Sequence, residues 1–453
     1  MFQECNLLFN GWDFLKGKNL NSQLSFLFFI IALLLICCIS CDTAEPPDNK
    51  FKLEDVSCTE AWITLTTNNL PLPATITLKQ TNPNGDTKSQ ILNLNTKDSL
   101  LYIDSLLPNQ TYKCKVSSIQ QQVSSNELSV TTLDTTSQNF SFEILEFGDG
   151  FESSYFNDVW VFDENNIWAV GYISPSDTIV NGTPIINPNI IRWNGIKWEL
   201  EPFDGTSSGI DGIWAVNPSL IYFAFGNILK YQNGVYEHII VPGNWQMGQR
   251  IEKLWGSSES NIYGVGPWGT IVWYNGVKWT KIEYDTQWYF YEITGNKETG
   301  VGYAVAINQS SDCIVVKLEN SATEIFYRQL TSDIKIHSVT LTELNNFLYI
   351  PNDWQNTICR ISEKTGKVEV IHQITGSFGM EQSSAVSSND IYFFGPDYSG
   401  IGVWLLHFNG IRYKTLEIPS VDRDNLGSLH AIKDLAVSVG FTNNKAYIIK
   451  IRR

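Results

Sequence analysis

Apolar and polar residues alternate along most of this chain, in short runs bounded by Gly, Pro, Asn or Asp. Such period-two runs predict β-strands. From residue 166 onward a longer phrase also recurs: an apolar strand ending in Gly, a loop, a second apolar strand, Asn-Gly and an aromatic residue. One copy, NIYGVGPWGTIVWYNGVKW, spans residues 261–279. Internal repetition at this scale predicts a fold built from repeated supersecondary units.

The repeat occurs seven times. The residues that end its first apolar strand are spaced by 55, 40, 40, 45, 44 and 45 positions, at Gly171, Gly226, Gly266, Ala306, Pro351, Gly395 and Gly440. The long first step contains an insertion at 173–189. Units of this length predict a seven-bladed β-propeller over residues 139–453, in which each blade has four strands, named a to d from the inside outward.

The connections between strands c and d carry Asn-Gly in four units, at Asn194-Gly195, Asn233-Gly234, Asn275-Gly276 and Asn409-Gly410. Asn-Gly favours a two-residue hairpin turn in which both residues have positive φ. The a–b and c–d connections of a propeller lie on one face. We therefore predict that this face is short and inert, and that the longer b–c and d–a loops carry function on the opposite face.

The last repeat is short, because strands a, b and c use the chain up to its end at Arg453. An apolar segment at 139–148 precedes the first strand a and has no unit of its own. We predict that this segment supplies the missing outer strand of the last blade. Such a pairing closes the ring and removes exposed sheet edges.

Residues 51–137 form a separate region of short alternating runs. Five strands are predicted there, at Ala61–Thr67, Ala74–Gln80, Leu100–Leu106, Thr111–Ile119 and Glu127–Thr135. The most specific stretch is LLPNQTYKCKV, Leu106–Val116, in which Tyr112, Cys114 and Val116 share one face of a strand.

This stretch resembles the fibronectin type III pattern of Leu, Pro and a Tyr that opens a core strand. The resemblance implies an Ig-like β-sandwich in which the hydroxyl of Tyr112 bonds the backbone a few residues upstream. The family's usual Trp lies later in its second strand, so Trp62 departs from the pattern. Modules of this kind are mainly spacers or adhesive units. The repeats that follow resemble bacterial extracellular propellers, a likeness that is specific to fold and not to activity.

The N-terminus has the features of an export signal. Leu24–Ile39 is an uncharged apolar run, Lys16 and Lys18 precede it, and a Cys follows at position 41. Residues 1–40 resemble a bacterial lipoprotein signal peptide, which implies lipidation of Cys41 and a linker over 41–50. An uncleaved anchor and a simple cleaved signal remain alternatives. All three readings place the protein outside the cytoplasm, and the lipoprotein reading places it at the outer membrane or cell surface.

The chain carries a net charge of −16. A surface this acidic repels phosphate backbones, which argues against nucleic acid as a partner. Export permits disulfides, and Cys58 and Cys114 lie in the same module. They could form a disulfide or remain two buried thiols.

The predicted b–c and d–a loops carry an unusual set of aromatic and acidic residues. We predict that this face binds a glycan or a peptide by stacking and hydrogen bonding. The candidate contacts are Trp245, Trp268, Trp288, Trp354, Tyr398, Asp285, Asp353 and Asp397. The alternative is that these side chains pack within the blades and contact no ligand.

Enzyme and metal motifs are absent from the sequence. The five His are scattered over different repeats without metal spacing, and no nucleophile elbow, P-loop or zincin motif occurs. His430, in a strand a, could line the central channel, but a satisfied core His is the favoured reading. The sequence therefore predicts a non-enzymatic, membrane-anchored binding protein with no cofactor and no metal. A polysaccharide hydrolase or lyase and an envelope scaffold are the alternatives.

Overall fold

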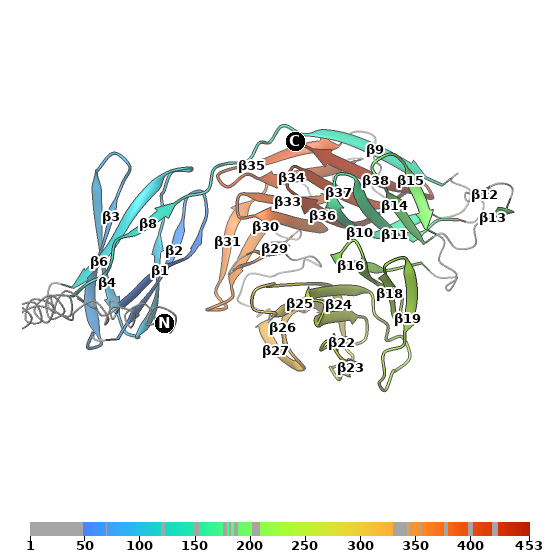
Figure 1. Ribbon diagram of the computed structural model, residues 1–453, viewed down its shortest axis with the longest axis horizontal. Helices are drawn as coiled ribbons and strands as arrows, with labels where there is room; N and C mark the ends of the chain where they lie inside the picture. Colours follow the sequence, from blue (N-terminus) through green and yellow to red (C-terminus); the bar gives the residue numbers. More distant parts are fainter. Residues whose placement is uncertain are drawn as a thin grey trace, which may run out of the picture.

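The computed structural model describes residues 49–453 except 69, 119–122, 149–153, 175–178, 181–182, 185–188, 202–208, 329–341, 345–346, 353–355, 376–378, 397–401 and 419–424. The described residues form an all-β protein with two parts (Figure 1). None of their segments forms a helix long and apolar enough to cross a membrane. The predicted leader and Cys41 lie outside the described residues.

The first part is two facing antiparallel sheets. One has the order β1-β2-β5, and the other has the order β4-β3-β6-β7 with β8 also paired to β6. The strands are β1 (Asn49–Val56), β2 (Ala61–Thr67), β3 (Ala74–Thr81), β4 (Thr87–Leu94), β5 (Asp98–Ile103), β6 (Thr111–Ser118), β7 (Val123–Ser124) and β8 (Leu128–Thr131). Both sheets contribute to one apolar core. The five predicted strands are present, and β1, β4 and β7 are additional.

Tyr112 has the geometry expected from its sequence. It begins the inward-facing series of β6 with Cys114 and Val116, all of them buried. Its hydroxyl accepts a hydrogen bond from the backbone N–H of Leu107 at 2.8 Å. The bond ties the loop before β6 to the core, and it satisfies a polar atom that burial would otherwise penalise.

The second part is a β-propeller. Its described residues form seven four-stranded antiparallel sheets. The first three sheets are β10 (Tyr155–Asp163), β11 (Asn166–Tyr172), β14 (Ile190–Trp193) and β15 (Trp198–Glu201); β16 (Gly212–Asn217), β17 (Leu220–Ala224), β18 (Ile228–Gln232) and β19 (Val235–Ile239); β20 (Lys253–Ser258), β21 (Asn261–Gly266), β22 (Thr270–Tyr274) and β23 (Trp279–Ile282). The insertion in the first carries a small hairpin, β12 (Ile179–Val180) and β13 (Thr183–Pro184).

The remaining four sheets continue the series. They are β24 (Trp288–Gly295), β25 (Gly302–Asn308), β26 (Cys313–Glu319) and β27 (Ala322–Arg328); β28 (Thr342–Leu344), β29 (Phe347–Asn352), β30 (Thr357–Ser362) and β31 (Val368–Gln373); β32 (Gln382–Ser387), β33 (Asp390–Pro396), β34 (Val403–Phe408) and β35 (Tyr413–Ile418); and β36 (Asn425–Ile432), β37 (Leu435–Thr442), β38 (Lys445–Arg452) and β9 (Ser141–Phe147). The second strand of a sheet is buried on both faces, as in β17 and β33, which explains its continuous apolar sequence.

The last sheet takes its outer strand from the start of the domain. β9 pairs antiparallel with β38, and Leu145 lies opposite Ile448. Ile144 packs on the cluster shared with the preceding sheet, whereas Leu145 packs on the cluster shared with the first sheet. The segment 139–148 therefore makes the pairing that the short last repeat predicts.

The Asn-Gly turns differ from the expected geometry at three of four sites. Only at Asn233-Gly234 do both residues have positive φ, of 50° and 88°. At the other three, Gly alone has positive φ, and the Asn side chain accepts hydrogen bonds from the backbone N–H groups two and three residues later. Asn therefore acts mainly as a side-chain cap of the turn.

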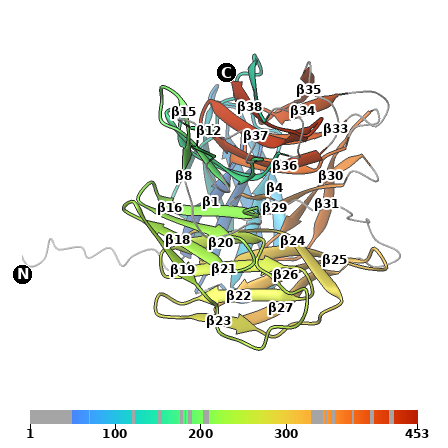
Figure 2. The ribbon, with the colours of Figure 1, turned by 90° about the vertical axis from the view of Figure 1, so that its right-hand side faces the viewer.

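We call the side of the propeller that carries the a–b and c–d turns the turn face, and the opposite side the loop face. The first domain lies behind the ring in Figure 2, against the turn face. Its contacts are with the turn after β30, through Lys364, and with the turns at Ser388 and Asn409. The prediction that the turn face is inert was wrong, because this face is the docking surface of the first domain.

Arg360 of β30 is central to this contact. Its guanidinium forms a two-fold ion pair with Glu60, at 3.0 and 3.2 Å. It also lies over the ring of Phe347, with 4.8 Å from Cζ to the ring centroid. Trp62 packs against Phe347 with the rings tilted by 56° and 5.1 Å between centroids, and it is 8% exposed. Trp62 therefore lies between the two domains and not in the core of the first one.

Cys58 and Cys114 are both free thiols in the structure. Cys114 faces the sandwich core, whereas Cys58 lies at the domain boundary, where its Sγ contacts the backbone oxygen of Asp134 at 3.2 Å. A Cβ at Gly410 would come within 2.2 Å of the Cys58 sulfur, so only glycine fits this turn. The thiol alternative holds, and burial raises the pKa of each thiol to about 11.

Candidate functional site

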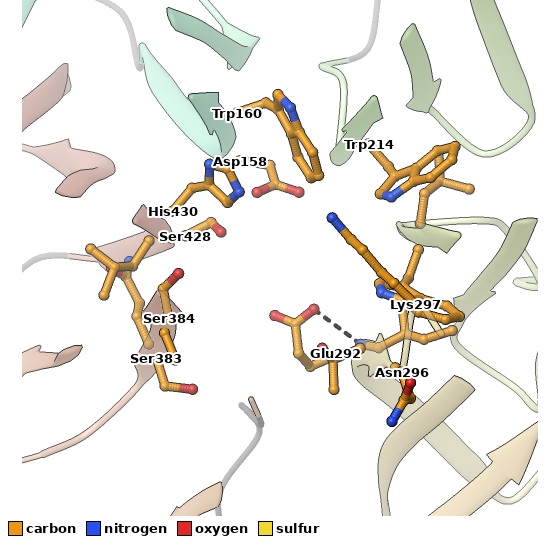
Figure 3. A pocket seen from close by; sticks show the side chains of 18 of the residues that line it. Asp158, Trp160, Trp214, Glu292, Asn296, Lys297, Ser383, Ser384, Ser428 and His430 are labelled. Carbon is orange, nitrogen blue, oxygen red and sulfur yellow. Dashed lines mark hydrogen bonds between the residues drawn. The ribbon is translucent and has the colours of Figure 1, made fainter. Parts of the chain in front are cut away.

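A cavity of about 650 Å³ runs along the centre of the propeller and is lined by the innermost strands (Figure 3). Each of these strands carries its channel-facing side chains at alternate positions. The walls therefore hold two successive layers of side chains, the first nearer the loop face and the second nearer the turn face.

The first layer is ionic. Asp158 of β10, Lys253 of β20 and Glu292 of β24 occupy equivalent places, two residues before the Trp160, Trp255 and Thr294 of their strands. Asp158 and Glu292 line the cavity directly. This layer was not predicted from the sequence. Its signal is a charged residue at the same position of the innermost strand in the first, third and fourth repeats, two residues before Trp160, Trp255 and Thr294.

Asp158 is fully engaged by the protein. One carboxylate oxygen accepts the backbone N–H of Val159 at 2.9 Å, and the other accepts that of Ile213 at 3.1 Å. The second oxygen also lies 3.3 Å from the Lys253 ammonium. Burial would lower the pKa of Lys253, but the carboxylates of Asp158 and Glu292 outweigh it and raise that pKa. Lys253 therefore stays charged and neutralises Asp158.

Glu292 is in a different state. It accepts one hydrogen bond, from the backbone N–H of Ile293 at 3.0 Å, and makes no ion pair within 4.0 Å in the part of the chain that the structure describes. Desolvation raises the pKa of its carboxyl to about 7, although Lys253 opposes the shift. Near neutral pH this group is therefore divided between its protonated and ionised forms.

The second layer is largely aromatic. The innermost strands of the first three sheets contribute Trp160, Trp214 and Trp255. His430 of β36 completes the layer beside Trp160. The rings of His430 and Trp160 stack at 4.4 Å between centroids. Nδ1 of His430 accepts the backbone N–H of Val161 at 2.9 Å. Burial lowers the pKa of His430 to about 4, so its imidazole is neutral at physiological pH.

The channel ends against the first domain. Lys297, from the β24–β25 turn, extends into the cavity in Figure 3. Lys52, Glu54 and Asp55 of β1 line the same cavity at this end. The wall of the channel is therefore built from both domains, and a ligand would approach from the loop face.

Trp268 agrees best with the predicted loop-face site. Its side chain is 45% exposed, and its backbone φ is +57°, a left-handed value that is costly for an aromatic residue. Gln249 donates to its backbone oxygen at 2.7 Å. The neighbouring N–H of Gly269 donates to the Trp288 oxygen at 2.7 Å, so the loops that carry Trp268 and Asp285 adjoin. Asp285 is exposed, and hydrogen bonds from Gln287 lower the pKa of its carboxyl.

Two other predicted contacts serve packing. Trp288 is 6% exposed in the core between the third and fourth sheets, so it is not a surface contact. Trp245 is half-buried; its Nε1 donates to the Val241 oxygen at 2.9 Å, and Lys281 lies over its ring at 5.6 Å. Trp288 therefore packs within the blades, and most of the Trp245 side chain does so as well. Asp353, Trp354, Asp397 and Tyr398 lie outside the described residues.

Comparisons with known proteins identify no family: no family model matches the chain, and no curated protein matches it. Solved propellers are similar at low identity. A structure titled YCF48 bound to D1 peptide shares 13% identity over 70% of this chain and 99% of that chain, with a TM-score of 0.49. The WD40 propeller domain of Doa1 shares 11% identity over 69% and 97%, with a TM-score of 0.47. The sheets themselves, rather than these likenesses, establish the fold.

No group of three or more His, Cys, Asp or Glu among the described residues is arranged to hold a metal ion. The described channel is lined by charged, hydroxyl and aromatic side chains.

Proposed function

We propose that this protein is a non-enzymatic surface lipoprotein, anchored through Cys41, in which a fibronectin type III-like domain carries a seven-bladed propeller that binds a glycan or peptide ligand. The observation that supports the proposal most strongly is the docking of the first domain. It covers the turn face at the fifth and sixth sheets through Arg360 and Glu60 and closes one end of the channel, so a ligand would reach the channel from the loop face.

The exposed Trp268 tests this proposal. We expect Trp268→Ala to weaken binding of a glycan or peptide ligand by roughly tenfold, because aromatic anchors commonly contribute more than about 1 kcal/mol to an interface. Val277→Ala is the matched control. Val277 is an exposed apolar residue in the turn between β22 and β23, on the turn face. The measurement is a glycan and peptide array, followed by calorimetry of each hit. Equal binding by the wild type and Trp268→Ala would contradict a loop-face site around this residue.

The lipid anchor has its own test. We expect Cys41→Ser to move the protein from the membrane fraction to the soluble fraction, because a thioether-linked lipid requires the cysteine sulfur. Cys38→Ser is the control, and fractionation with immunoblotting is the measurement. Membrane retention of the Cys41→Ser protein would favour an uncleaved anchor.

A polysaccharide-active enzyme is the second candidate. One observation favours it: the carboxyl of Glu292, with a pKa of about 7, is poised as a general acid would be. In its neighbour Asp158, however, both carboxylate oxygens already accept backbone hydrogen bonds, from Val159 and Ile213, and one also pairs with Lys253. Release of reducing ends from a polysaccharide panel, lost in Glu292→Gln, would favour the enzyme over the binding protein.

A further inference from the structure

Carboxylates dominate the lining of the central channel. Six of the side chains that line the cavity are acidic, against the two ammonium groups of Lys52 and Lys297. The acidic residues are Glu54, Asp55, Asp158, Glu292, Glu298 and Glu381. Asp158 and Glu54 each pair with a lysine that does not line the cavity, at 3.3 and 3.1 Å, and the carboxylates still outnumber the cations. The charge of the channel therefore favours a cationic ligand.

Glu292 is the carboxylate best placed to receive a cation. One of its oxygens accepts the N–H of Ile293 at 3.0 Å, and the other makes no hydrogen bond within the described part of the chain. Figure 3 shows this carboxylate directed into the cavity. Desolvation opposes its ionised form, and a bound cation would reduce that penalty. Glu292 is therefore an acceptor that the fold leaves without an ion pair.

Aromatic rings form much of the wall beyond Glu292. Trp160 is half-buried, Trp214 and Trp255 are buried, and all three line the cavity. Aromatic rings attract ammonium and guanidinium groups, most strongly over their faces. Apolar walls also strengthen the attraction between a ligand cation and the carboxylates, because they exclude water. His430 is neutral and adds no repulsion.

An organic cation fits this arrangement better than a metal ion does. The carboxylates belong to different strands and to both domains. In the described part of the chain, no three His, Cys, Asp or Glu side chains converge to hold a metal. A guanidinium carries five N–H donors and an ammonium carries three, so a long basic side chain can meet several separate acceptors.

Lys297 shows that the channel admits such a side chain. It extends into the cavity in Figure 3 and is exposed. Its ammonium forms no ion pair within 4.0 Å among the described residues, in contrast to the buried Lys253. Exposed side chains change rotamer readily, so a ligand cation can take the place of this ammonium.

We propose that the channel binds the basic side chain, arginine or lysine, of a peptide. The side chain enters from the loop face, because β1 lines the other end, and its cation meets Glu292 and the indole rings. The rest of the peptide lies across the loop face, where Trp268 is exposed. This inference rests on the proposed binding function and narrows its ligand to a peptide with a basic residue.

The test uses two capped pentapeptides, Gly-Gly-Arg-Gly-Gly and the same sequence with citrulline in place of arginine. Citrulline keeps the shape of arginine and removes its charge. We expect the full-length protein to bind the arginine peptide about tenfold more tightly, because charge-assisted hydrogen bonds are stronger than neutral ones. Ligand-observed NMR is the measurement, since it also detects weak affinities. Equal binding of the two peptides, or binding of neither, would overturn the inference.

Two variants should move the affinity for the arginine peptide in opposite directions. Glu292→Gln should weaken binding about tenfold at pH 8, because the ligand loses its charged acceptor. Lys297→Gln should tighten binding, because a competing cation is removed. The matched controls are Glu237→Gln on the outer strand β19 and Lys278→Gln on the turn before β23, both exposed outside the channel. Weaker binding by Lys297→Gln, or no change in either variant, would refute the site.

Binding should also be tighter at pH 8 than at pH 6, because the carboxyl of Glu292, with a pKa of about 7, ionises in between. Lys253, Asp158 and Lys297, which face Glu292, keep their charges over this range, and His430 stays neutral. Asp211, whose pKa burial raises to about 6, also ionises in this range, so loss of the pH effect in Glu292→Gln assigns it. A pH effect that is the same in wild type and Glu292→Gln would count against the inference.

The outcomes separate the inference from the proposed function. An arginine peptide that binds through Trp268 but is indifferent to Glu292 and Lys297 leaves the binding function intact and refutes the channel site. Binding of a free polyamine such as spermidine, without binding of the peptide, overturns the peptide assignment. If the wild type binds nothing on the glycan and peptide arrays, the proposed function itself is wrong.

Discussion

Glu292 shows how the channel couples charge to stability. Burial raises the pKa of its carboxyl from 4.5 to about 7, so the folded protein holds this proton more tightly than the unfolded chain does. The stabilisation is complete below pH 4.5 and is lost as the pH rises through about 7. A group of this kind favours the folded state in acid and opposes it in base.

We therefore expect Glu292→Gln to unfold at higher urea concentration than the wild type at pH 8, and to differ less at pH 5. The upper limit of the difference is on the order of 3 kcal/mol, because one pKa unit corresponds to about 1.4 kcal/mol. Asp211→Asn is a useful comparison, since its pKa of about 6 predicts the same sign with a smaller size. An identical pH dependence in wild type and Glu292→Gln would show that Glu292 is not desolvated.

The residues of the site were predicted unevenly, for a physical reason. Exposed loop residues such as Trp268 can be found as conspicuous aromatics between strands. Trp288 has the same appearance in the sequence but lies in the core, because burial depends on the neighbouring sheet. Asp158, Lys253 and Glu292 come from three different sheets, so their proximity is a property of the ring and not of any local motif.

At the level of strands, prediction succeeded where pattern and turn chemistry agree. β2 (Ala61–Thr67) and β21 (Asn261–Gly266) begin and end as predicted, because each alternates or runs apolar between clear turn residues. β4 was not predicted, since most of its residues are exposed and its sequence, TKSQILNL, carries little alternation. The domain contact could not be predicted, because Trp62 packs against Phe347, a residue of the other domain that lies far along the chain.

β9 gives the clearest test at this scale. Its residues Ile144 and Leu145 point to opposite sides and pack on two different clusters. We expect the double variant Ile144→Ala/Leu145→Ala to destabilise the propeller by about 2 kcal/mol, less than for fully buried residues because both are only partly buried. Tryptophan fluorescence in urea is the measurement.

The control for β9 lies on the same strand. Glu146→Ala removes an exposed ion pair with Lys445, which should contribute less than about 1 kcal/mol. A destabilisation by Glu146→Ala as large as that of the double variant would mean that the strand is held by charge and not by packing.

At the scale of the whole molecule, the first domain is part of the propeller's channel as well as its support. The chain after β8 is tied to the sixth sheet, where the hydroxyl of Thr136 donates to the Asn389 oxygen at 2.7 Å and Gln138 donates to the His407 oxygen at 2.9 Å. The domains are therefore joined by these hydrogen bonds, by the ion pair of Arg360 with Glu60 and by the aromatic contact of Trp62 with Phe347. Such an arrangement predicts a rigid pair of domains and not a flexible tether.

Arg360 is the residue on which this rigidity depends most. Its side chain is 13% exposed, and its removal leaves Glu60 without its cationic partner, at a cost on the order of 3 kcal/mol. We expect Arg360→Ala to loosen the domains, seen as a larger radius of gyration in small-angle X-ray scattering and faster proteolysis near residue 135. Lys364→Ala, which breaks an exposed ion pair with Glu54, should leave both unchanged. Unaltered scattering by Arg360→Ala would mean that Trp62 and the hydrogen-bonded chain after β8 hold the domains together without Arg360. If the scattering changes, β1 leaves the end of the channel, and ligand binding in the channel should weaken in the same variant.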